Sequence, residues 1–247
     1  MDNIAEPTAR ADWPDFSLYR PHPPAASLRE WLADAHALTR TLTQRIDSAT
    51  AVPMLTIVNP PLWELGHIAW FQEFWLHRGG DFAAPSMLRD ADRWYDSARV
   101  AHDTRWSLDL PDAQATRAYV EAVYGRTQSL LNDEALSDAR AYFAQLAIFH
   151  QDMHNEAFCY MWQTLGYPMD ADWPEMDASA APDIEVPGGI VSLGAKPGCG
   201  FVFDNEKWAH EVALPAFAIA SRAVSNGEYC EFVEDRGYSR REFWSES

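Results

Sequence analysis

The stretch from Phe149 to Ala157 reads FHQDMHNEA and lies within the longest helical segment that the sequence predicts, from about Ser137 to Leu165. The apolar positions of this segment recur at helical spacing and form one stripe: Tyr142, Phe143, Leu146, Phe149, Met153 and Ala157. His150 and His154 lie in or beside that stripe and are four residues apart, so their imidazoles point the same way, about one turn from each other. Two side chains placed in this way can hold one metal ion.

A second apolar stretch reads LWELGHIAWF from Leu62 to Phe71, and it predicts a helix that continues to about His77 and ends at Gly79. Four of its large side chains share one face: Trp63, His67, Trp70 and Phe74. His67 can therefore meet His150 and His154 across the core of a helix bundle. Three imidazoles without a carboxylate would leave open coordination positions on a metal ion.

Two further amphipathic segments predict the remaining helices of a four-helix bundle. The first begins at Ser27, a capping residue with Glu30 three positions later, and ends at about Asp47. The other spans about Asp112 to Asn132. Residues 79–112 have no sustained period, which predicts a long irregular connection of a kind that is often functional.

The character of the sequence changes after Gly166. The residues from Tyr167 to Pro187 are rich in proline and acidic side chains, which indicates a linker between domains. Short β-like pieces follow, with turn residues between them: Ile184–Val186, Gly189–Gly194, Phe201–Phe203 and Glu211–Leu214. Ser225 and Glu228 form a capping box that predicts a short helix to about Asp235. The predicted fold is mainly α, with a bundle followed by the start of an α+β domain.

The composition excludes some classes of partner. Asp and Glu outnumber Lys and Arg by 37 to 19, a net charge of −18, so the field of the chain repels nucleic acids and anionic membranes. It would attract a cationic small molecule, although acidity can also serve solubility alone. No segment approaches 18 uninterrupted apolar residues, and the three cysteines contain no CxxC pair. We expect no nucleic-acid or membrane partner and a reducing, cytoplasmic location.

The histidine spacing alone leaves the metal and the chemistry open. A tetrahedral three-histidine site with a water molecule suits Zn²⁺ and hydrolysis, whereas a facial set with three open positions suits Fe(II). Glu156 lies more than about 100° around the helix from the two histidines, so it is a candidate for orienting a ligand or for a surface ion pair. The serine-nucleophile, Walker and dinucleotide motifs GxSxG, GxxxxGK and GxGxxG are absent from the sequence.

Two motifs together resemble one known family. They are PPLWELGHIAWFQEFW (Pro60–Trp75) and FHQDMHNEAFCYMWQTLGYP (Phe149–Pro168), and they are similar to the sulfoxide synthases of ergothioneine biosynthesis and to selenoneine synthase. These enzymes have a DinB-like four-helix bundle followed by a domain similar to the formylglycine-generating enzyme, a C-type-lectin-like fold also called the sulfatase-modifying factor domain. FDNEK (Phe203–Lys207) and VSNGEY (Val224–Tyr229) resemble the usual opening of that second domain.

The resemblance gives the expected domain bounds. Residues 1–26 form an N-terminal extension, 27–167 the DinB-like bundle with the metal site, 168–187 the linker, and 188–247 the first part of the second domain. Members of the family are considerably longer, and the tyrosine that some use as a proton donor lies in the part that this sequence lacks. We therefore expect the chain to be a fragment, and its catalytic residue is not identified.

The resemblance also implies the cofactor and the reaction. His67, His150 and His154 correspond to the ligands of a nonheme Fe(II), with Glu156 beside them in an HxxxHxE pattern. The family uses O₂ to join a sulfur donor oxidatively to the imidazole carbon of hercynine, the trimethylated betaine of histidine, and the selenium branch uses a selenosugar. Binding the donor, hercynine and O₂ at one centre turns a three-body encounter into a unimolecular step. Met153 stands where some members have a glutamine that contacts hercynine.

The connection before the third bundle helix also resembles a loop near the active site of this family, in YDSARVAHDTRW from Tyr95 to Trp106. Arg99 and Arg105 are candidates for binding a substrate carboxylate, because a guanidinium offers a bidentate fork. The alternative is that both are surface arginines in an acidic loop.

Three functional hypotheses remain open at this point. The first is an iron oxidoreductase that forms a carbon–sulfur or carbon–selenium bond on hercynine, with a thiol or selenosugar as the donor. The second is a metal-dependent hydrolase or thiol transferase on a DinB-like bundle. The third is an inactive fragment or non-catalytic module in which the histidines only pack. No motif in the sequence decides between sulfur and selenium.

Overall fold

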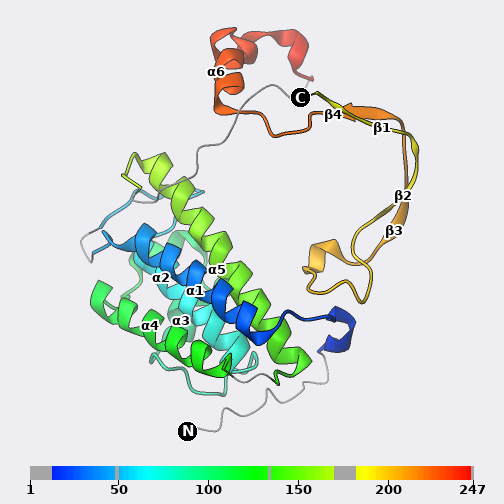
Figure 1. The fold of residues 1–247 in the computed structure, drawn as a ribbon. Helices are drawn as coiled ribbons and strands as arrows, with labels where there is room; N and C mark the ends of the chain where they lie inside the picture. Colours follow the sequence, from blue (N-terminus) through cyan, green and yellow to red (C-terminus); the bar gives the residue numbers. More distant parts are fainter. Residues whose placement is uncertain (1–12, 48–49, 133–134, 170–181, 246–247) are drawn as a thin grey trace. The chain divides into compact units, whose positions relative to one another are not determined.

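The computed structural model describes residues 13–47, 50–132, 135–169 and 182–245 (Figure 1). It divides into two compact units. The first unit comprises Met1–Asp172 together with Lys196–Lys207, and the second comprises Trp173–Ala195 and Trp208–Ser247. Part of the predicted N-terminal extension, residues 1–12, and most of the predicted linker, residues 170–181, lie outside the described residues.

The first unit is built on a four-helix bundle, as the sequence predicts. Its long helices are α1 (Ala25–Thr43), α2 (Pro61–Gln72), α4 (Ala113–Leu130) and α5 (Asp138–Leu165). They lie side by side in Figure 1, with α1 packed on α5 and with α2 packed on both α4 and α5. Helices α2 and α5, which carry the three candidate histidines, are therefore direct neighbours.

Local capping sets the ends of α4 and α5. The side chain of Asp112 accepts a hydrogen bond from the backbone of Ala115, and that of Ser137 accepts one from Arg140. Gly166 ends α5 in the left-handed region, at φ 67°, which glycine adopts without strain. Both helices begin and end within two residues of their predicted bounds.

The predicted start of α1 at Ser27 is wrong. The helix begins at Ala25, directly after Pro24, which adopts φ −55° and makes no side-chain capping bond. A proline pre-sets a helical φ and lacks the N–H that would otherwise stay unpaired, so it suits a helix start. The helix also ends at Thr43 instead of Asp47, because the guanidinium of Arg117 donates to the carbonyls of Thr43 and Ile46, at 2.6 and 2.9 Å.

Helix α2 continues as a π-helical segment, η2 (Glu73–His77), to its predicted end. The buried carboxylate of Glu73 accepts three hydrogen bonds, from the Ser86 hydroxyl at 2.7 Å, the Met87 backbone at 2.6 Å and the Tyr119 hydroxyl at 2.5 Å. These contacts tie the widened turn to the connection that follows and to α4. Widened turns of this kind often lie beside functional sites.

The predicted irregular connection contains two short elements, α3 (Ala91–Tyr95) and the 3₁₀ helix η3 (His102–Ser107). Tyr95 is fully buried and lies against Gly66 of α2. A Cβ atom at Gly66 would come within 2.2 Å of the Tyr95 ring, so the absence of a side chain lets the connection approach α2. This approach brings the backbone of Tyr95 to the candidate metal centre.

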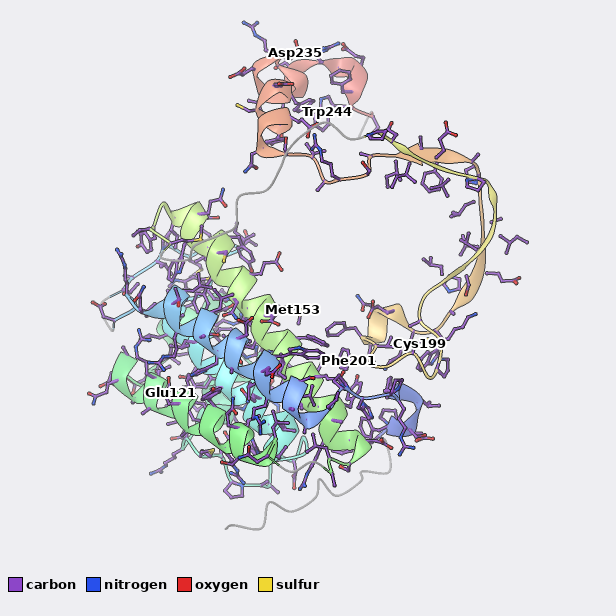
Figure 2. All side chains as sticks on the ribbon, viewed as in Figure 1. Glu121, Met153, Cys199, Phe201, Asp235 and Trp244 are labelled. Atoms are coloured by element: carbon purple, nitrogen blue, oxygen red, sulfur yellow. The ribbon has the colours of Figure 1, made fainter. Side chains whose placement is uncertain are left out.

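The segment Lys196–Lys207 packs against the bundle as part of the first unit. Its backbone N–H groups at Gly198 and Gly200 donate to the carbonyls of Leu18 and Arg20, at 2.7 and 3.2 Å. The ring of Phe201 reaches α5 (Figure 2) and contacts Phe149, with ring centroids 5.1 Å apart. The predicted strand Phe201–Phe203 is wrong, because these aromatic side chains pack on a helix instead of pairing in a sheet.

The second unit contains two antiparallel ribbons and a helix. Strand β1 (Ile184–Val186) pairs with β4 (Phe217–Ile219), and β2 (Gly189–Leu193) pairs with β3 (His210–Leu214). Helix α6 (Asn226–Glu234) begins with the predicted capping box of Ser225 and Glu228. The sequence analysis did not predict the three-residue β4. Within the described ranges, every helix is too short or too polar to cross a membrane.

Candidate metal centre

The structure brings together the three histidines that the sequence singles out. His67 comes from α2, and His150 and His154 come from α5. One nitrogen from each lies within 4.8 Å of one nitrogen of the others. His67 is only 3% exposed, and the other two are buried or half-buried. Two helices thus present three imidazoles to one point in the interior of the bundle.

Hydrogen bonds fix the orientation of two of these rings. Nδ1 of His67 lies 2.7 Å from the carbonyl of Tyr95, and a carbonyl can only accept, so Nδ1 carries the proton. Nδ1 of His154 lies 2.5 Å from Oε1 of Glu64, and it donates to that carboxylate. In the neutral tautomers of both rings, Nε2 therefore keeps its lone pair, which is the arrangement that metal-binding histidines use.

The third ring is held by stacking. His150 lies parallel to Phe71, with ring centroids 3.6 Å apart and an angle of 8° between the planes. Its Nε2 is 3.1 Å from Nε2 of His154. Two nitrogens bound at right angles to one ion, each about 2.1 Å from it, would be about 3 Å apart, so this pair has the separation of two ligands on adjacent positions.

The centre favours neutral imidazoles. Burial lowers the pKa of His67 to about 4, with a further lowering from His154. Burial also lowers the pKa of His150 well below its ordinary value, assisted by His154 and His67. Both rings are therefore unprotonated at neutral pH. Nδ1 of His150 is moreover buried without a hydrogen-bond partner among the described residues. The donor set fits a divalent cation, because neutral imidazole is the ligand form and a cation would satisfy the converging lone pairs.

Glu64 is the carboxylate of the centre, and the sequence analysis did not identify it. It is 1% exposed, and it accepts hydrogen bonds from His154 and, at 2.8 Å, from Nδ2 of Asn59. Burial alone would raise its pKa, but the hydrogen bond and charge of His154, with smaller effects of His67 and Asn59, hold that pKa below its usual value. The available signal was a carboxylate three residues before His67 in an otherwise apolar run.

The sequence predicts that Glu156 orients a ligand or forms a surface ion pair. Glu156 is exposed on α5, because it lies on a different face of the helix from His150 and His154. The carboxylate that contacts a histidine of the centre belongs to Glu64 on the neighbouring helix. Met153, a predicted substrate contact, is 49% exposed and points outward from α5 (Figure 2).

The two predicted arginines differ in their surroundings. Arg105 lies next to the centre and donates to Oδ1 of Asn59 at 2.8 Å and to the Val100 carbonyl at 3.3 Å. Arg99 is 63% exposed at its side chain, lies 3.3 Å from the carboxylate of Asp96 and stacks 3.8 Å above the Phe82 ring. Arg99 also lines a pocket.

That pocket has a volume of about 420 Å³ and adjoins the centre. Aromatic side chains form much of its wall, and residues of the connection after α3 complete the lining: Trp70, Phe71, Phe74, Trp75, Gly80, Phe82, Asp96, Ser97, Ala98 and Arg99. Phe71 belongs both to this wall and to the stack on His150. A small molecule in the pocket would therefore lie one aromatic ring away from a candidate ligand, with a guanidinium at its edge.

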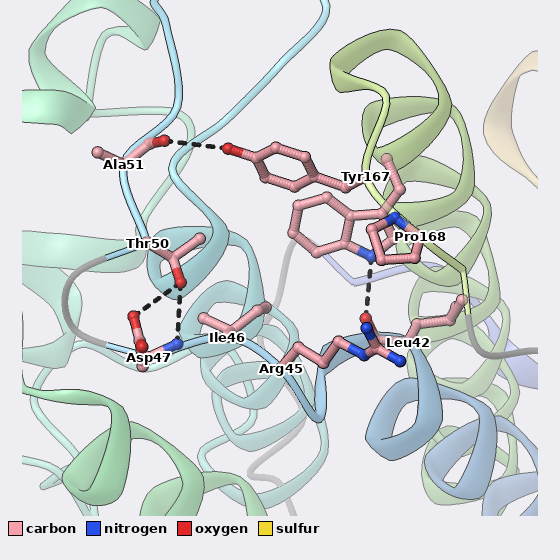
Figure 3. A pocket seen from close by; sticks show the side chains of 9 residues that line it. Leu42, Arg45, Ile46, Asp47, Thr50, Ala51, Tyr167 and Pro168 are labelled. Atoms are coloured by element: carbon pink, nitrogen blue, oxygen red, sulfur yellow. Dashed lines mark hydrogen bonds between the residues drawn. The ribbon is translucent and has the colours of Figure 1, made fainter.

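A separate pocket of about 440 Å³ lies between the ends of α1 and α5 (Figure 3). The indole of Trp162 donates to the Leu42 carbonyl at 2.9 Å, and the hydroxyl of Tyr167 donates to the Ala51 carbonyl at 3.4 Å. Trp162 follows His154 by eight residues, about 12 Å along the helix axis. This pocket is thus distinct from the histidine centre.

Comparison with known proteins agrees with this architecture. Residues 50–158 match the DinB superfamily, and residues 171–247 match the sulfatase-modifying factor enzyme 1-like domain. The hercynine oxygenase of Mycolicibacterium smegmatis is 33% identical over 237 residues, which cover 88% of this chain and 53% of that protein. The hercynine oxygenase of Mycobacterium tuberculosis is 33% identical over 228 residues, which cover 87% of this chain and 52% of that protein.

A third relative, the hercynine oxygenase of Mycolicibacterium thermoresistibile, is 31% identical over 238 residues. The chain spans about half the length of the curated relatives it matches. The residues that match the DinB superfamily include all three histidines of the centre of this chain. The chain is therefore similar to the hercynine oxygenases over about half of their length, and it combines a region that matches the DinB superfamily with a region that matches the sulfatase-modifying factor enzyme 1-like domain.

Proposed function

We propose that this chain provides the metal centre of a nonheme Fe(II), O₂-dependent oxidoreductase that forms a carbon–sulfur or carbon–selenium bond on the imidazole of hercynine. The observation that carries the proposal is the convergence of His67, His150 and His154 in a protein similar to hercynine oxygenases. When bound, Fe(II) would supply the redox chemistry that O₂ activation requires. A thiol or a selenosugar would be the donor.

The ligand set favours an iron site with open coordination positions over a closed structural metal site. Three neutral imidazoles leave several coordination positions open, and sites with open positions are typical of nonheme Fe(II) oxygenases. Glu64 does not compete for those positions, because it is turned toward Nδ1 of His154 and is bound by Asn59. The same three histidines would also accept Zn²⁺, which is why a metal-dependent hydrolase or thiol transferase is the alternative.

The residues around the centre give it a defined environment. Phe71 covers His150 and forms part of the adjoining pocket, so it excludes water from one side of the centre. We propose that Arg99, at the edge of this pocket, binds the carboxylate of a substrate, because its guanidinium is largely exposed there. Met153 remains a proposed contact to hercynine from the exposed side of α5.

We also propose a cellular location and a set of domain bounds for this protein. Cys159, Cys199 and Cys230 are free thiols in the structure, which suits the reducing cytoplasm where we propose that the protein acts. The domain bounds at 27–167 and 188–247, with residues 168–187 as a linker, are proposed on the resemblance to the family.

The function can be tested by anaerobic Fe(II) titration followed by O₂-uptake measurements. We expect one Fe(II) per chain, and O₂ uptake that requires both hercynine and a donor, with mass spectrometry showing sulfur or selenium joined to hercynine. Retained zinc with hydrolytic activity and no O₂ uptake would favour the alternative enzyme class. Iron binding without O₂ uptake in the presence of both substrates would contradict the catalytic part of the proposal and favour a non-catalytic module.

A further inference from the structure

Arg105 reaches two histidines of the centre through two separate sets of contacts. It lies on the 3₁₀ helix η3, outside the two helices that carry the ligands. One route runs through polar groups to His154 on α5, and the other runs through stacked rings to His67 on α2. A single side chain of the connection is thus linked, through other residues, to a histidine on each of the two helices.

The polar route has only one possible direction for its hydrogen bonds. Arg105 donates to Oδ1 of Asn59 at 2.8 Å, and Nδ2 of Asn59 donates to Oε2 of Glu64 at 2.8 Å. The other oxygen of Glu64 accepts from Nδ1 of His154 at 2.5 Å. A guanidinium can only donate and an ionised carboxylate can only accept, so the Asn59 amide between them is held in one orientation. The positive charge of Arg105 is thereby linked to the buried negative charge of Glu64.

The stacking route fixes the other helix. The guanidinium of Arg105 lies 3.8 Å above the ring of Trp63. The Trp63 ring in turn lies parallel to His67, with centroids 4.8 Å apart and an angle of 10° between the planes. The indole N–H of Trp63 donates to the Trp94 carbonyl at 2.7 Å, which prevents the ring from turning. His67 is thus held between this stack and the Tyr95 carbonyl.

We infer that Asn59 and Arg105 are positioning residues that hold His67 and His154 with their Nε2 atoms directed at one shared metal ion. The inference rests on the proposed metal site and goes beyond it, because neither residue supplies a ligand atom. It also changes the role expected for Arg105. Its two terminal nitrogens already donate to Asn59 and Val100, so a structural contact to the centre accounts for its position without a substrate carboxylate.

Removing Asn59 would affect the centre through Glu64. The carboxylate is 1% exposed, so without the Asn59 donor its Oε2 atom would lose a partner in a site that water reaches poorly. The carboxylate could then turn and carry the ring of His154 with it. Outer groups that orient metal-bound histidines typically change metal affinity by about 10–100-fold.

The test uses Co(II) alone as the probe, because its visible absorption bands report ligand geometry. The variants are Asn59→Leu and Arg105→Gln in the full chain, with Arg89→Gln as the matched control on the same connection, because the Arg89 side chain is 95% exposed. We expect Asn59→Leu and Arg105→Gln each to weaken Co(II) binding by about tenfold or more and to change its visible spectrum. Arg105→Gln should have the larger effect because it removes the Arg105 contacts of both routes, and Arg89→Gln should match the wild type.

The outcomes separate this inference from the proposed function. If the wild-type chain binds Co(II) and both variants retain its affinity and spectrum, the positioning role is overturned while the metal site stands. If the wild-type chain binds no divalent metal, both ideas fail together. Circular dichroism checks folding, and Arg105→Lys provides a second variant at that position. It keeps the charge but loses the planar group over Trp63, and it should fall between the wild type and Arg105→Gln.

Discussion

His154 donates a hydrogen bond from Nδ1 to Oε1 of Glu64 at 2.5 Å, although 90 positions separate the two residues in the chain. The contact joins α5 to α2, the two helices that carry the candidate ligands. A buried carboxylate requires partners of this kind, since its removal from water is otherwise costly. Helix packing and imidazole orientation are therefore set by the same pair of side chains.

Replacing Glu64 with Gln should weaken metal binding. The amide has no charge, and its NH₂ group would either face the Nδ2 donor of Asn59 or fail to accept from His154. We expect an affinity loss of about 10–100-fold in anaerobic Fe(II) titration. Glu156→Gln is the control, because Glu156 is exposed on the same helix as His154. Equal losses of Fe(II) affinity in the two variants would show that removing any nearby negative charge weakens binding, and would contradict a specific role of Glu64.

The close approach of Gly66 and Tyr95 gives a prediction about stability. Gly66→Ala should lower the free energy of unfolding by about 1–3 kcal/mol, because the new Cβ atom would collide with the Tyr95 ring. Gly125→Ala lies in α4 with nothing within 4 Å of the added atom, and it should raise the free energy of unfolding by about 0.5–1 kcal/mol. Chemical denaturation measures both, and a neutral Gly66→Ala would contradict the packing described.

A buried polar cluster between α1 and α5 supports the histidine-bearing face. The hydroxyl of Thr39 accepts from Nε2 of Gln151 at 2.8 Å and lies 2.7 Å from Oδ1 of Asn155. Thr39→Val should cost about 1–3 kcal/mol of unfolding free energy, because it leaves buried amides without a partner. Thr41→Val is the matched control, since the Thr41 hydroxyl bonds to Ala37 within α1 at an exposed position. Urea unfolding of both variants should show a clear difference between them.

His77 makes the stability of the metal-free protein depend on pH. Burial lowers its pKa to about 3, with additional lowering from Arg126 and Arg140. Its Nε2 lies 2.7 Å from the Thr127 hydroxyl, while Nδ1 is buried without a partner among the described residues. Protonation of the folded protein would thus place an unpaired donor in the interior.

The sign of this effect follows from linkage. An unfolded histidine has a pKa of about 6.5, so below that pH the unfolded chain binds a proton that the folded chain does not bind until about pH 3. The free energy of unfolding therefore falls as pH decreases through this window, and His77 has no effect above it. The wild type should lose unfolding free energy between pH 7 and pH 5, and we expect His77→Gln to make that loss smaller by about 1–2 kcal/mol. If the unfolding free energies of His77→Gln and of the wild type depended on pH in the same way, His77 would not be the cause of the pH dependence.

The parts of the fold that were predicted correctly depend on local signals. The caps at Asp112, Ser137 and Gly166 act on neighbouring backbone groups, so they can be recognised without knowledge of the rest of the chain. The parts that were missed depend on distant contacts. Phe201 packs on Phe149, which is distant in the sequence, and no local repeat around Phe201 indicates that contact.

The same distinction applies to the centre. His67, His150 and His154 could be selected because each lies at helical spacing within an apolar stripe. Glu64 was missed because its function depends on His154 in another helix. The contacts through which Arg105 positions the histidines likewise depend on Asn59 and Trp63. These residues become neighbours of Arg105 only when the connection folds over α2.

The most direct test of the central claim is X-ray absorption spectroscopy of the Fe(II)-loaded chain, prepared without O₂. We predict scattering from three imidazole ligands in the wild type, and from fewer in each of His67→Ala, His150→Ala and His154→Ala. His77→Ala, which removes a buried histidine outside the centre, should leave the wild-type spectrum unchanged. Iron without imidazole scattering, or a spectrum that none of the three substitutions alters, would contradict the account.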